Sequence, residues 1–242
     1  MKKMDSEILT IIKNHIKKND FVDIETFLQL ALYEKNHGFY SQIDIDQKKL
    51  IGSNGHFITS PEISQMFGEL IAIWIIDFCN QLKTTNLNLV ELGPGNGTLI
   101  SDILRIFSKE KKNKILVNLY FLEHSEILSK LQYNKISQYE FKKNWYKSFS
   151  VLENDLKNSP TIILANEFFD CLPIQQFQRN DDSKTWHKIC LKLRNDELYI
   201  DKIPATKNEN NLIKQINSYN YSENIVKNFI EYSKSRSKFM EN

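Results

Sequence analysis

Hydrophobic residues recur every three or four positions near the start of the chain, at Ile8, Ile11, Ile12 and Ile16. This spacing predicts an amphipathic helix with one buried face. A second helix is expected after Asp23, because an aspartate carboxylate can accept an N–H group of the first helical turn. The pair at residues 37–38, histidine followed by glycine, is a common helix end, so we expect this second helix to stop there.

The periodicity is lost between residues 39 and 57 and returns with the sequence SPEISQMFGELIAIWIIDFCNQL. Ser60, Pro61 and Glu62 have the order of an N-cap, a first helical residue and a first-turn acid, which predicts a helix start. After Phe67 the apolar residues occupy most of the helix circumference. A helix of this kind is expected to be buried.

Three short apolar runs, at residues 88–92, 117–122 and 161–165, alternate with segments of helical spacing at residues 99–107 and from residue 125 onward. Alternation of strands and helices predicts an α/β fold with a mostly parallel sheet and right-handed crossovers. The third run, TIILA, contains no charged residue, and we expect helices to cover it on both faces.

The pattern changes after residue 175, where polar and apolar residues alternate around Phe177, at 186–193 and at 198–203. Asn195 and Asp196 separate the last two runs, which predicts a β-hairpin. Two polar helices are expected at 210–217 and 223–233. We therefore predict an N-terminal helical region (1–85) that packs on a core (86–242) with the hairpin as an insertion.

The composition argues against several classes of partner and site. The 242 residues are 41% hydrophobic and 26% charged with a net charge of +2, so the chain lacks the strongly basic character of a nucleic-acid-binding domain. The three cysteines are far apart, which is typical of a reducing compartment. The histidines have no ligand spacing, so no metal site is expected. Charged residues interrupt every apolar segment before the length of a membrane span, and the N-terminus does not resemble a signal peptide.

Three of the seven glycines fall in one stretch, VELGPGNGT, at Gly93, Gly95 and Gly97. A strand, a glycine-rich turn and a helix form a cofactor crevice at the carboxyl end of a parallel sheet. A purely structural tight turn is the alternative. The spacing is G-x-G-x-G, so the third glycine is one residue too early for the dinucleotide fingerprint.

Two acidic residues indicate which cofactor would fit. Glu91 precedes the first glycine by two positions, where it would attract a cationic amine and repel a pyrophosphate. Glu123 ends the next strand, where a carboxylate can accept hydrogen bonds from both ribose hydroxyls. A ligand with an ammonium group, a ribose and no phosphate matches S-adenosylmethionine, so we assign the three glycines and both acids to binding this cofactor.

The stretch VELGPGNGT also resembles the first motif of class I methyltransferases. Three further stretches are similar to the MidA-type branch of that family, which is related to mitochondrial complex I assembly factor 7. They are Ala31-Leu32-Tyr33 with Gly38-Phe39-Tyr40, then GHFITSPEISQMFGE, and finally ANEFFDCLPIQQF. The resemblance covers residues 27–200, and one departure is His56, where the family usually has an aspartate.

The resemblance implies a Rossmann-like sheet, N-terminal helices, a hairpin insertion and transfer of a methyl group to a protein arginine, in a complex I subunit for the mitochondrial relatives. Glu167 and Asp170, after the TIILA run, are the expected catalytic residues that would hold the guanidinium, and Asn166 is assigned to the cofactor. Capping of a helix by Asn166 and Asp170 is the alternative. Ser60, Pro61 and Glu62 are expected near the cofactor only because of the resemblance.

Members of this family continue with further strands, so we expect a shortened C-terminal part here, weak turnover of the chain alone, and association through the unpaired edge of the TIILA strand. Two other functional classes remain open. One is a nicotinamide-dependent oxidoreductase, and the other is an assembly or interaction protein that keeps the fold without turnover. The expected location is the cytoplasm of a bacterium, or the mitochondrial matrix for a eukaryotic source.

Overall fold

The computed structural model describes residues 6–41, 58–110, 115–156, 159–180, 182, 184–218 and 228–240. The chain divides into two compact units, which are residues 43–171 and, from two separate segments, residues 1–42 with 172–242. This division differs from the expected boundary at residue 85. The reason lies in the packing, because α4 (Gln65–Gln81) packs on α5 (Thr98–Lys109) beside the parallel sheet, whereas α1 (Ser6–Asn19) packs on strand β7 (Trp186–Arg194) of the other unit.

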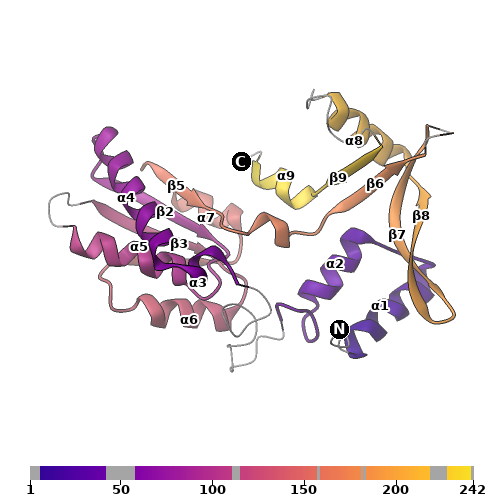
Figure 1. Ribbon diagram of the computed structural model, residues 1–242, viewed down its shortest axis with the longest axis horizontal. Helices are drawn as coiled ribbons and strands as arrows, with labels where there is room; N and C mark the ends of the chain where they lie inside the picture. Colours follow the sequence, from indigo (N-terminus) through magenta and orange to yellow (C-terminus); the bar gives the residue numbers. More distant parts are fainter. Residues whose placement is uncertain are drawn as a thin grey trace. The chain divides into compact units, whose positions relative to one another are not determined.

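The unit of residues 43–171 contains a four-stranded parallel sheet with the order β4-β3-β2-β5 (Figure 1). Its strands are β2 (Asn86–Leu92), β3 (Leu116–Leu122), β4 (Lys142–Tyr146) and β5 (Thr161–Leu164). In the central register Leu89 lies opposite Leu119 of β3 and Ile162 of β5. The predicted α/β fold and the parallel sheet are confirmed, with β4 as a strand that the apolar pattern did not reveal.

Helices of this unit are α3 (Ser60–Ile63), α4, α5, α6 (Glu126–Ile136) and α7 (Phe149–Asp155). Side chains of α4, α5 and α6 share one hydrophobic core with the strands, including Ile75, Ile103 and Ile136. Gly68 allows α4 and α5 to approach closely, since a Cβ atom at this position would lie 2.6 Å from the Cβ atom of Asp102. The core therefore fixes the positions of the parallel strands, whose carboxyl ends lie along one edge of the sheet.

The helix predicted from Ser60 is in fact two helices. Thr59, rather than Ser60, is the N-cap of the short α3, and the backbone is extended at Ser64. The Ser64 hydroxyl accepts a hydrogen bond from the Met66 N–H and so starts α4. The prediction that this helix is buried on most sides is also wrong, because one face of α4 is exposed.

Strand β5 differs from its predicted environment as well. Ile162 is buried, but Ile163 on the opposite face is about half exposed, so the strand is covered on one face and not on both. In the described part of the chain β5 pairs only with β2. Its other edge has no paired strand within the described ranges.

The second unit is built around an antiparallel sheet. Strands β1 (Val22–Asp23), β7, β6 (Gln175–Arg179) and β9 (Phe229–Tyr232) are neighbours in this order, and β8 (Glu197–Pro204) pairs with β7. Asn195 and Asp196 form the turn between β7 and β8 with φ of 51° and 62°, the left-handed conformation that a two-residue hairpin needs. The predicted hairpin is thus confirmed.

The helices of this unit are α1, α2 (Ile24–Tyr33), α8 (Lys207–Ser218) and α9 (Lys234–Met240). Asp23 caps α2 as predicted, with its carboxylate accepting the Thr26 N–H at 2.8 Å. The helix ends earlier than expected, at Tyr33, because the backbone leaves the helical conformation at Glu34, where ψ is 134°. The helix predicted over residues 223–233 is wrong where the chain is described, since β9 occupies its second half; residues 223–227 lie outside the described residues.

Candidate functional site

The glycine-rich turn joins the end of β2 to the start of α5. Gly93, Gly95 and Gly97 have φ values of 62°, 55° and 72°. Residues with a Cβ atom rarely adopt this left-handed conformation. Gly97 is the N-cap residue of α5 in the left-handed conformation. The turn is tied to the sheet because the Gly93 N–H donates to the Leu122 carbonyl at 3.0 Å.

Close approach is a second reason for glycine at two of these positions. A Cβ atom at Gly93 would lie 2.9 Å from the ring of Phe168, and one at Gly97 would lie 3.3 Å from the Cα atom of Gln132. Phe168 follows β5, so the segment ANEFF lies against the glycine turn. The structure therefore brings together two of the motifs that the sequence singled out.

Glu91 lies on β2 directly before the turn, and its side chain is buried at 3% exposure. Its Oε2 atom has no hydrogen-bond partner in the described part of the chain. Burial raises the pKa of this carboxyl to about 8. A buried acid without a partner costs stability, and a cation bound next to it would remove that cost.

Glu123 follows the end of β3, as predicted, and its carboxylate already has two internal contacts. Oε1 accepts the Ser125 N–H at 2.9 Å, and Oε2 accepts the Gln132 side-chain amide at 3.0 Å. Burial raises the pKa of Glu123, although both hydrogen bonds favour the charged form. Each carboxylate oxygen can accept a further hydrogen bond, so the contacts fix the group and leave capacity for ligand hydroxyls.

Gln132 on α6 is a site residue that the sequence analysis did not identify. Its side chain is fully buried, and its Nε2 donates both to Glu123 and to the Gly95 carbonyl, the latter at 2.8 Å. Its Oε1 accepts the Trp145 indole N–H at 2.9 Å. One amide thus connects the glycine turn, the end of β3 and strand β4.

The segment before α4 also reaches the glycine turn. Glu62 accepts hydrogen bonds through Oε1 from the Thr98 hydroxyl at 2.6 Å and from the Asn96 amide at 3.3 Å. Lys135 donates to the same Thr98 hydroxyl at 2.6 Å. Glu62 therefore holds the start of α5 in addition to its place in the first turn of α3, whereas His56 lies outside the described residues.

Asn166, Glu167 and Asp170 come directly after β5, at the same sheet edge as the glycine turn. Glu167 is exposed with φ of 49°, and its Oε1 accepts the Ser60 N–H at 3.4 Å. Asp170 is exposed and lies inside the short 3₁₀ turn η1 (Phe169–Cys171). The described residues contain no α-helix directly after β5, so a role of Asn166 and Asp170 as α-helix caps has no support.

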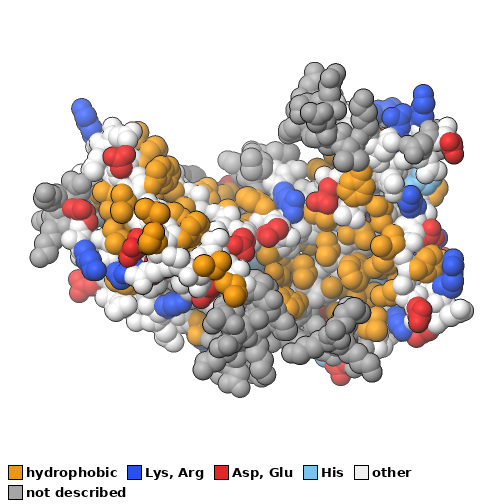
Figure 2. All heavy atoms as spheres, in the orientation of Figure 1, with side chains coloured by type: hydrophobic (Ala, Val, Ile, Leu, Met, Phe, Trp, Pro, Cys, Tyr) orange, Lys and Arg blue, Asp and Glu red, His pale blue; other side chains and the backbone are white. Residues whose placement is uncertain are grey.

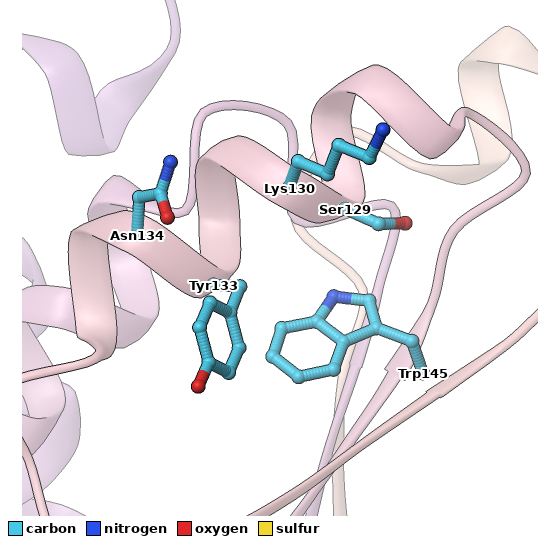
Figure 3. A pocket seen from close by; sticks show the side chains of 5 residues that line it. All are labelled: Ser129, Lys130, Tyr133, Asn134 and Trp145. Carbon is cyan, nitrogen blue, oxygen red and sulfur yellow. The ribbon is translucent and has the colours of Figure 1, made fainter.

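A cavity of about 390 Å³ lies beside this network, between α6 and Trp145 of β4 (Figure 3). It is lined by Ser129, Lys130, Tyr133, Asn134 and Trp145. Figure 3 shows the Tyr133 and Trp145 rings facing the same space, and their centroids are 5.9 Å apart. None of the residues predicted to bind cofactor or substrate lines this cavity.

The described ranges show neither a metal-binding cluster nor a membrane-spanning helix. No group of three or more histidine, cysteine or acidic side chains there is arranged to hold a metal ion. Among the helices described, none is both long enough and apolar enough to cross a membrane.

Comparison with known proteins gives a family match over residues 70–242, to the family described as "Putative S-adenosyl-L-methionine-dependent methyltransferase". A mitochondrial protein arginine methyltransferase NDUFAF7 from Danio rerio is 33% identical over 208 residues, which is 78% of this chain and 48% of the relative. The homologue from Caenorhabditis elegans is 32% identical and is matched over 76% of this chain and 47% of its own length. The chain thus spans about half the length of these curated relatives.

A solved structure shares the fold. A COG1565 superfamily protein from Burkholderia thailandensis, crystallised with S-adenosyl-homocysteine, aligns over 96% of this chain and 57% of its own with a TM-score of 0.71. The sequence identity is 14%, so this likeness concerns the fold alone.

Proposed function

Because the chain belongs to the S-adenosyl-L-methionine-dependent methyltransferase family that matches residues 70–242, we propose that it binds this cofactor at the glycine turn and methylates a protein. The finer proposal is that the methyl acceptor is an arginine side chain. It is supported by the names of the curated relatives, which are protein arginine methyltransferases. Since the chain spans about half of those relatives, activity, substrate and partner are proposals for this chain.

The observation that carries the proposal is the buried Glu91 carboxyl with its unpartnered Oε2 beside a left-handed glycine turn. S-adenosylmethionine has an α-ammonium group, a ribose and no phosphate, which fits these residues. Glu91 would hold the ammonium group, and Glu123 would accept hydrogen bonds from the ribose. Gly93, Gly95 and Gly97 would let the backbone approach the ligand, and Asn166 lies at the same sheet edge.

Bound S-adenosylmethionine supplies an electrophilic methyl group on a sulfonium. The protein's task is then to position the acceptor and to remove its proton. A guanidinium stays protonated at neutral pH because its pKa exceeds about 12. Glu167 and Asp170 would fix the guanidinium fork through charge-assisted hydrogen bonds, and one of these carboxylates would take the proton from the reacting nitrogen.

The substrate we propose is an arginine-containing subunit of respiratory complex I. This step rests on the resemblance to the complex I assembly factor. The corresponding location is the cytoplasm of a bacterium, or the mitochondrial matrix if the source is a eukaryote.

An assembly or interaction protein without turnover is the second candidate, and one observation favours it. Helix α4 has an exposed row of large apolar side chains, which is typical of a surface that binds another polypeptide. A nicotinamide-dependent oxidoreductase has no such support, because the third glycine of the turn comes one residue too early for the dinucleotide fingerprint.

The proposal is tested by single-turnover transfer of a labelled methyl group to an arginine-containing complex I subunit. Glu167→Gln keeps the shape of the side chain and removes the charge, so we expect methyl transfer to fall by about tenfold or more with little change in cofactor affinity. Glu140→Gln, at an exposed position before β4, is the matched control and should leave the rate unchanged. An active Glu167→Gln protein would remove the proposed role of this carboxylate.

A further inference from the structure

Two apolar features of the parallel-sheet unit lie outside the proposed cofactor site. Figure 2 shows hydrophobic side chains gathered over the first, the exposed row on α4. That row is the convex face of a helix, and nothing in the described part of the chain shows what covers it. The second feature is the cavity of about 390 Å³ between α6 and β4, which we call the α6 cavity (Figure 3). Its volume is within the range of small-molecule sites, so it can select a ligand by shape.

The α6 cavity has an aromatic wall. The rings of Tyr133 and Trp145 both face it, and their planes are tilted by 59°. Rings in contact keep their centroids at least about 4.5 Å apart, so the observed 5.9 Å leaves no space for a third ring between these two. A third ring fits instead against both of them from the open side, where Tyr133 is 54% exposed. The shape therefore favours a planar aromatic ring as the ligand.

The charge of the lining indicates which substituent that ring would carry. Lys130 is the one charged residue among the five that line the cavity, and no acidic side chain is among them. Glu126, one turn before Lys130 on α6, pairs with Lys147 at 2.7 Å, which leaves the Lys130 ammonium group available to a ligand. The Asn134 side-chain amide adds hydrogen-bond donors and an acceptor. A single cation beside an aromatic wall matches a planar ring with one negative charge, which is an aromatic carboxylate.

The aromatic wall is connected to the network at the glycine turn. The Trp145 indole N–H donates to Gln132 Oε1 at 2.9 Å. Gln132 Nε2 in turn donates to the Gly95 carbonyl at 2.8 Å and to Glu123 at 3.0 Å. Trp145 also packs on Phe121 of β3, with ring centroids 4.8 Å apart. A ligand that packs against the Trp145 ring therefore fixes a donor that is two hydrogen bonds away from the Glu123 carboxylate and the glycine turn.

We propose that the α6 cavity is an effector site for a small planar aromatic carboxylate. The ring packs on Tyr133 and Trp145, and the carboxylate accepts hydrogen bonds from Lys130. The ligand holds Trp145 and, through it, orders the Gln132 side chain. Binding at the α6 cavity and binding of S-adenosylmethionine then favour each other, since the first ligand orders side chains that the second would otherwise have to order. This coupling rests on the proposed cofactor site, whereas binding of the carboxylate does not.

The probe is 2-naphthoate, titrated by calorimetry into the full chain without cofactor. We expect saturable binding, and we expect cyclohexanecarboxylate and 2-naphthamide to bind at least about fivefold more weakly, because the first lacks the planar ring and the second lacks the charge. Lys130→Gln should weaken 2-naphthoate about fivefold and leave 2-naphthamide unchanged. Tyr133→Leu should weaken both aromatic probes about threefold.

Lys142→Gln is the matched control for the charge change. Lys142 is exposed on β4, and its side chain is on the opposite face of that strand from Trp145. The control variant should bind 2-naphthoate like the unchanged protein. Thermal unfolding of each variant without ligand checks that the fold is retained.

The coupling is measured in two ways. Without any cofactor, 2-naphthoate should slow hydrogen exchange at the Ser125 N–H, which donates to Glu123. It should also tighten S-adenosylmethionine binding about fivefold, and the cofactor should tighten 2-naphthoate binding by the same factor.

Absence of saturable 2-naphthoate binding, or equal losses for Lys130→Gln and Lys142→Gln, would overturn the site. Binding without slower exchange at Ser125 would overturn the coupling. Competition between 2-naphthoate and S-adenosylmethionine would assign the cavity to the cofactor and also overturn the proposal. A chain that binds 2-naphthoate and protects Ser125 but does not bind S-adenosylmethionine would support the effector site and contradict only the proposed cofactor site.

Discussion

Among the carboxyl groups that the structure describes, the one of Glu91 has the environment that differs most from water. It is buried, its Oε2 has no partner within the described structure, and its pKa is raised to about 8 from an ordinary value of 4.5. Desolvation is the cause, because burial penalises the charged form. In the chain without ligand the group is therefore neutral at pH 7.

This pKa predicts how stability depends on pH. Between about pH 4.5 and 8 the folded chain keeps a proton on Glu91 that the unfolded chain has lost, so the free energy of unfolding falls as the pH rises. The contribution approaches about 1.4 kcal/mol per pH unit in this window. Glu91→Gln removes this titration. In urea unfolding from pH 5 to 8, the free energy of unfolding of the variant should therefore rise relative to that of the unchanged protein. Parallel profiles for the two proteins would contradict the prediction, and Glu140→Gln serves as the exposed control.

Glu123 and Glu126 offer a matched comparison at neighbouring positions. Glu123 is largely buried at the strand end, whereas Glu126 is 74% exposed and pairs with Lys147 at 2.7 Å. Glu123→Ala should weaken S-adenosylmethionine binding by about tenfold or more, since hydrogen bonds to a charged group are lost. Glu126→Ala should change the affinity by less than about twofold because exposed ion pairs contribute little. Calorimetry measures the affinity of both folded variants for S-adenosylmethionine. Comparable losses of affinity would count against the assigned role of Glu123.

The positions of the candidate site residues in the fold were predictable where a strand ends in a recognisable pattern. Glu91, the three glycines and Glu123 follow from the apolar runs that precede them. Gln132 was not predictable, because a glutamine in a polar helix has no signal of burial in the sequence. Its hydrogen bonds to Gly95 and Glu123 require α6 to pack against the glycine turn, and this packing exists only in the folded unit.

At the scale of elements, Gln132 links α6 to the glycine turn and to β4. Gln132→Leu would leave the Gly95 carbonyl, the Trp145 indole N–H and one Glu123 oxygen without this partner. We expect a loss of about 2 to 4 kcal/mol in the free energy of unfolding, because unsatisfied buried polar groups are costly. The same change at Asn134, which is exposed on the same helix, should cost less than about 0.5 kcal/mol. Equal effects in urea denaturation would refute the linking role of Gln132.

Some elements could not be read correctly from apolar spacing alone. The segment from Ser60 has continuous helical spacing, yet the extended backbone at Ser64 divides it into α3 and α4. The exposed face of α4 was predicted to be buried because its composition is that of a core helix. Strand β4 was missed since its sequence, KKNWY, is polar and lies at the edge of the sheet. The spacing of residues 223–233 predicts a helix, but pairing with β6 makes residues 229–232 a strand, β9.

At the scale of the whole molecule, the sheet order β4-β3-β2-β5 places the glycine turn and the segment after β5 at the carboxyl ends of adjacent strands. This is where open α/β sheets bind their ligands. The division into two units could not be predicted from linear order, because one unit is assembled from residues 1–42 and 172–242. The family and the sheet class, in contrast, follow from short local motifs.

The most direct test of the account is calorimetric titration of the full chain with S-adenosylmethionine at pH 7, in two buffers of different ionisation enthalpy. Glu91 must lose its proton to pair with the ammonium group, so binding should be saturable and should release close to one proton, given a pKa of about 8. Gly95→Val should bind much more weakly, because a β-branched residue is strained at φ of 55°. Absence of binding, or equal affinity of the two proteins with no proton release, would contradict the proposed cofactor site.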